Sequence, residues 1–307
     1  MNASPTFLDP AALMAIRNLE LRARAVVEGF WHGLHRSPYH GFSVEFTEYR
    51  PYSPGDDPRY LDWRLVARTD RYFIKKFEDE TNLRCHLLVD NSKSMTFGSR
   101  SYTKAAYANT FAATLAYFLS QQGDAVGLLT FDEAVREYLP ARNRPRHLRQ
   151  LMLALEKEPG GTATDLAAPL KRIAELVRKR GLVVLVSDLL APVETLESSL
   201  AMLTASGHEV LLFHLADPAE IAFDFPAAAR FLDLETGRDL FLEPAVARAE
   251  YTRQRDAHLA AVHATCQRLG ISHHPLLTDQ PLELALFDFL NARRARGKIV
   301  RRRVAAH

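Results

Sequence analysis

One stretch, residues 84–95 with the sequence RCHLLVDNSKSM, constrains the fold of this chain more than any other. Its apolar run ends at Asp90, small polar residues follow, and a helical pattern begins at Lys104. This pattern predicts a buried strand that leads through a loop into a helix. Open parallel sheets bind ligands beyond the carboxyl ends of their strands, so we expect the loop after Asp90 to form part of a binding site.

The loop after this strand is rich in oxygen ligands. Asp90, Ser92 and Ser94 place one carboxylate and two hydroxyls within five residues. Oxygen ligands of this kind suit an octahedral Mg²⁺ or Mn²⁺ ion. Aspartate and serine also begin helices and form turns, so a capped helix start is the alternative interpretation. The pattern favours a metal site over a nucleophile.

The same three residues resemble the metal-ion-dependent adhesion site of von Willebrand factor A domains, in which Asp-x-Ser-x-Ser follows a hydrophobic strand. Asp90, Ser92 and Ser94 match those positions. The resemblance implies a parallel α/β fold that binds one divalent ion, Mg²⁺ or Mn²⁺, at the top of its sheet. It also implies that a threonine and a second aspartate from later loops complete the site.

Two later segments contain these residue types in the expected order. Residues 160–165, GGTATD, contain Thr162 and Thr164, and residues 182–188, LVVLVSD, form an apolar run that ends at Asp188. Thr162 is favoured as a ligand because it directly follows a glycine pair, which lets the backbone approach the ion closely. Thr164 has a competing role as the N-cap of the next helix.

Two segments near the N-terminus are similar to the signature of a bacterial family catalogued as domain of unknown function fifty-eight. They are residues 41–46, GFSVEF, and residues 50–63, RPYSPGDDPRYLDW. The resemblance extends from about residue 15 to about residue 290. Members of this family have an A-type domain and are often encoded beside MoxR-type AAA+ ATPases, so the resemblance implies such an ATPase as a partner.

The composition is that of a folded globular protein. The chain has 307 residues, of which 47% are hydrophobic and 25% charged, enough for one large domain and an accessory one. No uninterrupted apolar run approaches the ~20 residues that span a bilayer, so we expect no stable membrane insertion. Cys85 and Cys266 cannot form a disulfide framework, and we expect a reduced, cytoplasmic setting.

The periodicity predicts an α/β fold with a doubly wound, mostly parallel sheet. The resemblance implies that this sheet is of the von Willebrand factor A type. Residues 1–80 are expected to form an accessory helix and strands, residues 81–290 the A-like domain with an inserted hairpin near 229–243, and residues 291–307 a basic tail. The expected helices span residues 10–30, 104–122, 145–157, 166–180, 193–205, 245–269 and 281–294. The expected strands span residues 42–46, 72–77, 85–90, 125–131, 135–139, 182–188, 210–215 and 272–277.

These features predict a metal-dependent protein–protein interaction module rather than an enzyme. A partner is expected to supply a carboxylate to the ion, and the family resemblance implies an adaptor of a MoxR-type ATPase in protein assembly or remodelling. The alternative is a metal-dependent phosphohydrolase that uses the same ion as a Lewis acid. A haloacid-dehalogenase-type phosphatase needs a second aspartate two residues after the first as general acid, and Ser92 stands there.

Two other sets of residues have simpler interpretations. His273 and His274 lie in a predicted strand, where neighbouring side chains point to opposite faces, so we do not expect them to bind zinc together. Residues 291–307 hold seven Arg and Lys and no acid. Such a run can contact nucleic acid or anionic lipid, but a segment this short is more often a solvated tail, and nucleic-acid binding is not expected.

Overall fold

Six strands form the central sheet of the computed structural model, in the order β10-β7-β6-β3-β4-β5. All neighbouring strands are parallel except β4 and β5, which form an antiparallel hairpin at one edge. The inner strands are buried on both faces, which explains why their sequences are continuous apolar runs. The predicted doubly wound, mostly parallel α/β fold is confirmed.

The elements of the sheet and of its helical layers are defined within the residues that the structure describes. These are residues 7–36, 48–51, 73–76, 83–158, 167–177, 179–223, 225, 229–232, 234 and 239–304. The sheet strands are β3 Arg84–Asp90, β4 Ala125–Phe131, β5 Val135–Arg142, β6 Leu182–Ser187, β7 Glu209–Ala216 and β10 Ser272–Leu277. The helices are α1 Pro10–Met14, α2 Leu19–Arg36, η2 Lys93–Thr96, α4 Lys104–Gln121, α5 Pro145–Leu155, α6 Ala167–Leu176, α7 Val193–Ala205, α8 Pro218–Ala222, α9 Pro244–Leu269 and α10 Leu282–Val304.

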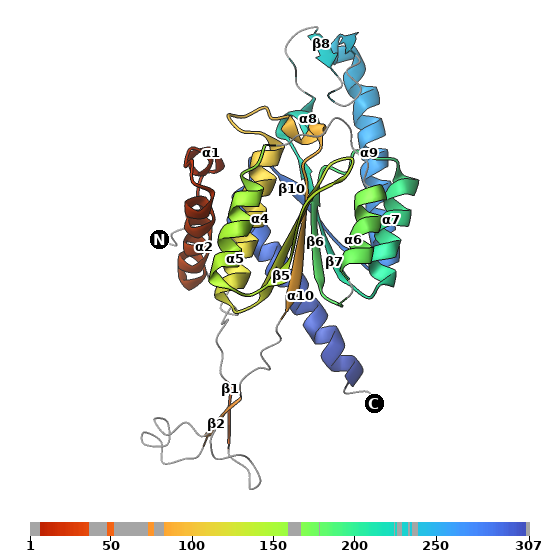
Figure 1. The fold of residues 1–307 in the computed structure, drawn as a ribbon. Helices are drawn as coiled ribbons and strands as arrows, with labels where there is room; N and C mark the ends of the chain where they lie inside the picture. Colours follow the sequence, from red (N-terminus) through yellow and green to blue (C-terminus); the bar gives the residue numbers. More distant parts are fainter. Residues whose placement is uncertain are drawn as a thin grey trace.

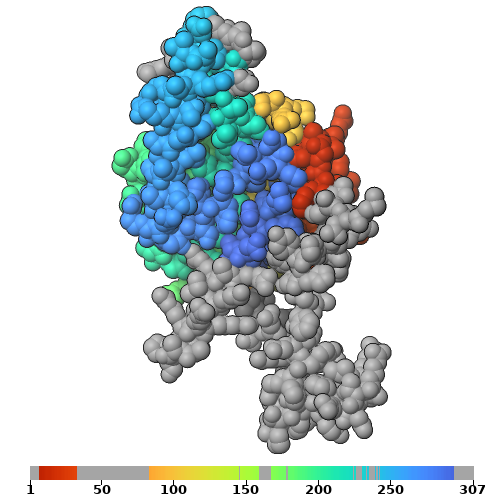
Figure 2. Space-filling view, turned by 180° about the vertical axis from the view of Figure 1, so that it is seen from behind, coloured from red at the N-terminus to blue at the C-terminus, as the bar shows by residue number. Residues whose placement is uncertain are grey.

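Different helices cover the two faces of the sheet (Figure 1). Leu87 and Val89 of β3 point into a core that they share with α2, α4, α5 and α10. Leu88, between them, points into a second core with α6, α7 and α9. This alternation follows from the period of two in a strand. From behind, Figure 2 shows α9 and α10 in blue and the N-terminal helices in red.

The predicted N-terminal helix over residues 10–30 is two helices, α1 and α2. The chain leaves helical geometry after Met14 and begins again at Leu19. The side chain of Asn18 causes the restart, because its Oδ1 accepts a hydrogen bond from the Leu21 N–H at 2.9 Å, as an N-cap does. The amphipathic pattern continued through the break, so periodicity alone predicted a single helix.

Two antiparallel strand pairs lie outside the central sheet. β1 (Glu48–Pro51) pairs antiparallel with β2 (Phe73–Lys76), which confirms the strand predicted near residues 72–77. β8 (Ala229–Leu232) pairs antiparallel with β9 (Asp239–Leu242), as predicted for the inserted hairpin. The strand predicted at residues 42–46 lies outside the described residues.

Two predicted helices have different lengths in the structure. The helix predicted at residues 166–180 is described only from Ala167 to Leu176, and the closing helix α10 continues to Val304 instead of ending near residue 294. The predicted basic tail therefore begins inside a helix, and its residue Ala292 is part of the core. Among the helices of the described residues, none is long and apolar enough to cross a bilayer.

A candidate metal site at the ends of β3 and β6

β3 and β6 are neighbours at the point where the strand order reverses. From β3 the chain crosses to β4 on one side, and it reaches β6 on the other side only after β5, α5 and α6. Ligands bind at the carboxyl ends of the strands at such a switch point. Asp90 ends β3, and Asp188 directly follows β6. The structure thus brings these two predicted ligands to the same place on one edge of the sheet.

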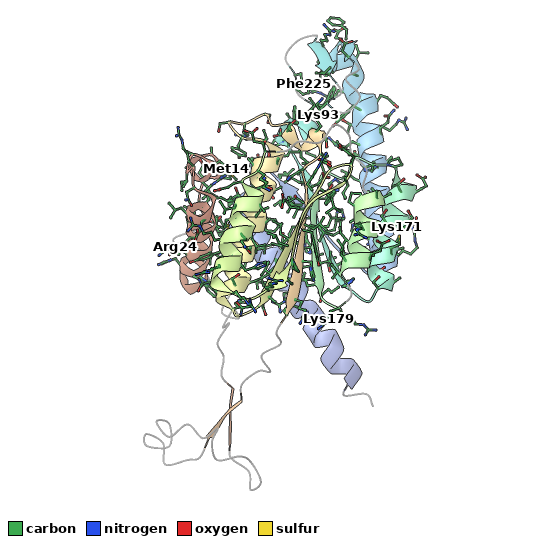
Figure 3. All side chains as sticks on the ribbon, in the orientation of Figure 1. Met14, Arg24, Lys93, Lys171, Lys179 and Phe225 are labelled. Carbon is green, nitrogen blue, oxygen red and sulfur yellow. The ribbon has the colours of Figure 1, made fainter. Side chains whose placement is uncertain are left out.

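The loop after β3 folds back on its own aspartate. Oδ1 of Asp90, a fully buried side chain, accepts a hydrogen bond from the Ser92 N–H at 2.9 Å. The next four residues form the short helix η2, in which Met95 is fully buried and fixes the loop to the core. This geometry places the Ser92 and Ser94 hydroxyls 3.0 Å apart, both buried. Lys93, labelled in Figure 3, marks this end of the molecule.

The arrangement of Asp90, Ser92 and Ser94 fits a small divalent ion. Ligands about 2.1 Å from Mg²⁺ in an octahedral shell have neighbouring oxygens about 3.0 Å apart. The two serine oxygens have this separation, and they come from one rigid loop. Among the described residues, no three His, Cys, Asp or Glu side chains are grouped to hold a metal. The predicted site combines carboxylate oxygens with hydroxyl oxygens, and it stays a prediction.

The remaining predicted ligand, Thr162, lies outside the described residues. The same is true of Thr164, the competing residue in that loop, and of the glycine pair before them. The choice between the two threonines therefore stays a prediction.

Asp188 is nearly fully buried, and hydrogen bonds fix it on both sides. Its backbone carbonyl accepts a bond from Nε2 of His214 at 3.0 Å. Burial first, and then the neighbouring His273, lower the pKa of His214 to about 4, so its ring is neutral at pH 7. Asp188 Oδ2 accepts a bond from Lys104 Nζ at 2.8 Å. His214 of the sheet thus holds the backbone of Asp188, and Lys104 of α4 holds its carboxylate.

The two carboxylates act on each other. Burial first, and then the negative charge of Asp188, raise the pKa of Asp90 above its ordinary range. The Ser187 hydroxyl, which donates to Asp90 Oδ2 at 2.6 Å, works in the opposite direction by stabilising the charged form. Two acids in a buried site have excess negative charge, and a bound cation neutralises such charge.

Pattern reasoning missed Lys104, which contacts the predicted site. Its side chain is 1% exposed, and its Nζ also lies 2.6 Å from Oε1 of Glu220 in α8. Burial alone lowers the pKa of Lys104, but the Asp188 and Glu220 carboxylates raise it overall, so it stays charged. The sequence contained a signal: Lys104 is the single charged residue in the helix KAAYANTFAATLAYFLSQ, whose other residues predict burial.

The two adjacent histidines and the cysteines behave as their sequence context predicts. His273 faces His214, with ring nitrogens 3.4 Å apart, whereas His274 stacks on Phe213 on the other face of the sheet. The opposite orientations are confirmed. Both cysteines are free and buried, and burial raises the thiol pKa of Cys85 and also that of Cys266, to about 11. Neither thiol is set up as a nucleophile.

Leu189, directly after Asp188, has a left-handed backbone with φ of 53°. A leucine there is strained by about 1–2 kcal/mol, which glycine avoids. The Leu189 side chain is fully buried, however, and losing such a side chain costs about 2–5 kcal/mol.

We expect Leu189→Gly to lower the free energy of unfolding by about 1–3 kcal/mol in urea titrations. Leu190→Gly, at a residue that is 54% exposed, is the control and should cost less than about 1 kcal/mol. A Leu189→Gly protein as stable as the wild type would contradict this balance.

Comparison with solved structures returns distant α/β proteins. An aerotolerance-related membrane protein from Bacteroides fragilis is 14% identical, with a TM-score of 0.46, over 68% of this chain and 99% of that one. BatB from Bacteroides thetaiotaomicron is 12% identical, with a TM-score of 0.43, over 70% and 99%. The VWA domain of SpRpn10 is 13% identical, with a TM-score of 0.40, over 66% and 92%. The α/β architecture of this chain is established by its own strand order and not by these similarities.

Comparison by sequence gives closer relatives. Uncharacterized proteins from Mycobacterium bovis and Mycobacterium tuberculosis are each 30% identical to this chain over 291 residues, which cover 93% of this chain and 91% of theirs. The family described as "Protein of unknown function DUF58" matches residues 48–261. The match covers most of the chain, including β3, β6 and the loops that follow them. The chain therefore belongs to the DUF58 family.

Proposed function

We propose that this protein is a metal-dependent protein-binding module. The observation that carries the proposal is the pair of buried hydroxyls of Ser92 and Ser94, 3.0 Å apart beside the buried carboxylate of Asp90. Asp188, from the adjacent strand end, would join them, and Thr162 is the fifth proposed ligand. A bound Mg²⁺ or Mn²⁺ would supply a positive centre that accepts one more oxygen ligand.

The protein's own residues prepare the site in three ways. The Ser92 N–H and the Ser187 hydroxyl each donate to one oxygen of Asp90, which fixes the orientation of the carboxylate. Met95 anchors the serine loop in the core. The neutral ring of His214 holds the backbone of Asp188. Ligands held in this way lose little conformational freedom when an ion and a partner bind.

The partner we propose offers a carboxylate. The ion would keep one coordination position that the protein's own residues do not fill. A carboxylate from another protein would fill it as the last ligand and become part of the interface. Membership of the DUF58 family, with the resemblance to A-type domains, supports a MoxR-type AAA+ ATPase or its client as that partner. We propose an adaptor role in protein assembly or remodelling, in a cytoplasmic setting.

Partner capture tests this proposal. The experiment is a pull-down with the MoxR-type ATPase as prey, comparing wild-type protein, Asp188→Ala and wild-type protein with chelator. We expect Asp188→Ala and chelator each to reduce the retained prey at least tenfold, because both remove the ion that connects the two proteins. The fold should persist at reduced stability. Asp188 lies outside both apolar cores, but its loss leaves the buried Lys104 with Glu220 as its remaining acidic partner.

Asp279→Ala is the matched control for the pull-down. This carboxylate lies just beyond β10, and its partner is the exposed Arg100 rather than any proposed ligand. It should retain the prey as the wild type does. Equal retention in all samples, chelator included, would remove the metal from the interface. Hydrolysis of phosphate esters that depends on Mg²⁺ and is lost in Asp90→Ala would favour the phosphohydrolase alternative instead.

A further inference from the structure

Lys104 joins one proposed metal ligand to a helix outside the site. Its Nζ lies 2.8 Å from Oδ2 of Asp188 and 2.6 Å from Oε1 of Glu220. Lys104 and Asp188 are 1% and 3% exposed, whereas Glu220 is 24% exposed. The ammonium is thus shared between a buried acid of the candidate site and a half-buried acid of α8.

The position of Lys104 in its helix does not favour a positive charge. It is the first residue of α4, directly after the N-cap Thr103. The N-terminus of a helix has a partial positive charge, so a lysine is unfavourable there. Burying an unpaired ammonium costs several kcal/mol more. The interactions with Asp188 and Glu220 are therefore what keeps Lys104 in place.

We infer that Lys104 is an internal cation that competes with the divalent ion for Asp188, and that Glu220 determines how strongly it competes. The inference rests on the proposed metal site. Oδ2 of Asp188 binds the ammonium, and a divalent ion close to the same carboxylate repels it. Lys104 must then move toward Glu220 for the ion to bind tightly. Glu220 makes that movement possible because it offers a second acceptor.

Glu220 is itself held by the fold around α8. Its Oε2 accepts a hydrogen bond from the Asp217 N–H at 2.8 Å, as part of a capping box. Its backbone carbonyl accepts one from the Tyr251 hydroxyl of α9 at 3.0 Å. α8 lies at the same end of the sheet as η2, and α9 extends beyond it toward β8 (Figure 1). The position of α8 is thereby coupled to the metal affinity of Asp188.

Two substitutions should change Mn²⁺ affinity in opposite directions. Lys104→Met removes the competing charge at similar side-chain length, and we expect Mn²⁺ to bind at least tenfold more tightly. Glu220→Gln removes the second negative charge but keeps the shape of the side chain, so Lys104 binds Asp188 more strongly and Mn²⁺ should bind three- to tenfold more weakly. Titration calorimetry of the full chain with Mn²⁺ measures both. In chelator, the midpoint of thermal unfolding should be lower for Lys104→Met than for the wild type. Adding Mn²⁺ should raise the midpoint of Lys104→Met by more than it raises the midpoint of the wild type.

A double substitution separates the coupling from a general charge effect. In the Lys104→Met background, Glu220→Gln should weaken Mn²⁺ binding no more than the control Asp279→Asn does in the wild type. Asp279 lies just beyond β10 and pairs with Arg100, so it controls for the loss of one acid. If Lys104→Met does not fold, the fall in affinity for Glu220→Gln relative to Asp279→Asn still decides the question.

The outcomes distinguish this inference from the function it rests on. Wild-type protein that binds no Mn²⁺ would overturn both. Wild-type protein that binds Mn²⁺, with Lys104→Met binding no more tightly, would leave the metal site standing and make Lys104 a structural ion pair only. The same conclusion would follow if Glu220→Gln and Asp279→Asn had equal effects.

Discussion

Asp90→Asn should abolish Mn²⁺ binding, with affinity reduced more than a hundredfold. Asp90 ends β3, the loop after it contains no other carboxylate, and its neighbours Ser92 and Ser94 are neutral ligands. An amide oxygen has no formal charge to neutralise a divalent ion, so the attraction that Asp90 adds to that of Asp188 is lost. Titration calorimetry with Mn²⁺ measures the effect: the wild type should show one site, and the variant none.

The same substitution should leave the protein folded. The Asp90 carboxylate is buried beside Asp188, and removing a buried like charge relieves repulsion. Against this, the Ser187 hydroxyl and the Ser92 N–H compete for the single oxygen of asparagine. We expect the two effects to oppose each other, so that in chelator the free energy of unfolding of Asp90→Asn lies within about 1–2 kcal/mol of the wild-type value. For the same reason, chelator alone should not unfold the wild type, whose large apolar cores do not need the ion.

Asp132→Asn is the matched control for Asp90→Asn. Asp132 is also fully buried, and it follows β4 at the same edge of the sheet, but it pairs with Arg136 at 2.5 Å and is not a proposed ligand. Its Mn²⁺ affinity should stay within about threefold of the wild type, even if stability falls from breaking the ion pair. Wild-type affinity in Asp90→Asn would place the metal elsewhere in the protein.

The strand ends could be predicted because they are local features. An apolar run that is buried on both faces ends where the strand leaves the sheet, so the sequence predicts Asp90 and Asp188 at the carboxyl ends of their strands, on one edge of the sheet. Parallel order then follows from the strand–helix alternation. These two steps need no knowledge of packing, and the structure agrees with both.

The interactions of Lys104 could not be predicted, because they join residues far apart in sequence. Glu220 lies 116 positions from Lys104, in a five-residue helix that no periodic pattern reveals. The break between α1 and α2 was missed for a different reason. Asn18 acts as a cap through one hydrogen bond, and the surrounding apolar spacing gives no sign of it. The periodicity of apolar residues predicts neither ion pairs between distant residues nor a helix cap made by a single side chain.

The helix α2 belongs to the segment that the sequence predicts to be an accessory region. It packs against α4 and α10 within the same core as the central sheet. Phe30 lies at the centre of this packing. Its ring is fully buried and contacts the rings of Trp31, Phe118 and Phe287, with centroids 5.7, 6.2 and 4.6 Å away. Phe118 belongs to α4, the helix that begins with Lys104.

Phe30→Ala should therefore destabilise the whole domain by about 3–5 kcal/mol, the usual cost of a large cavity in a core. Leu21→Ala, on the exposed side of the same helix at 55% exposure, is the control and should cost less than about 1 kcal/mol. Urea unfolding can be monitored by circular dichroism and by the loss of Mn²⁺ binding. The two signals should change in one coincident transition, because α2 and the site share one core. Two separate transitions, with Mn²⁺ binding retained after α2 unfolds, would make α2 an independent accessory element.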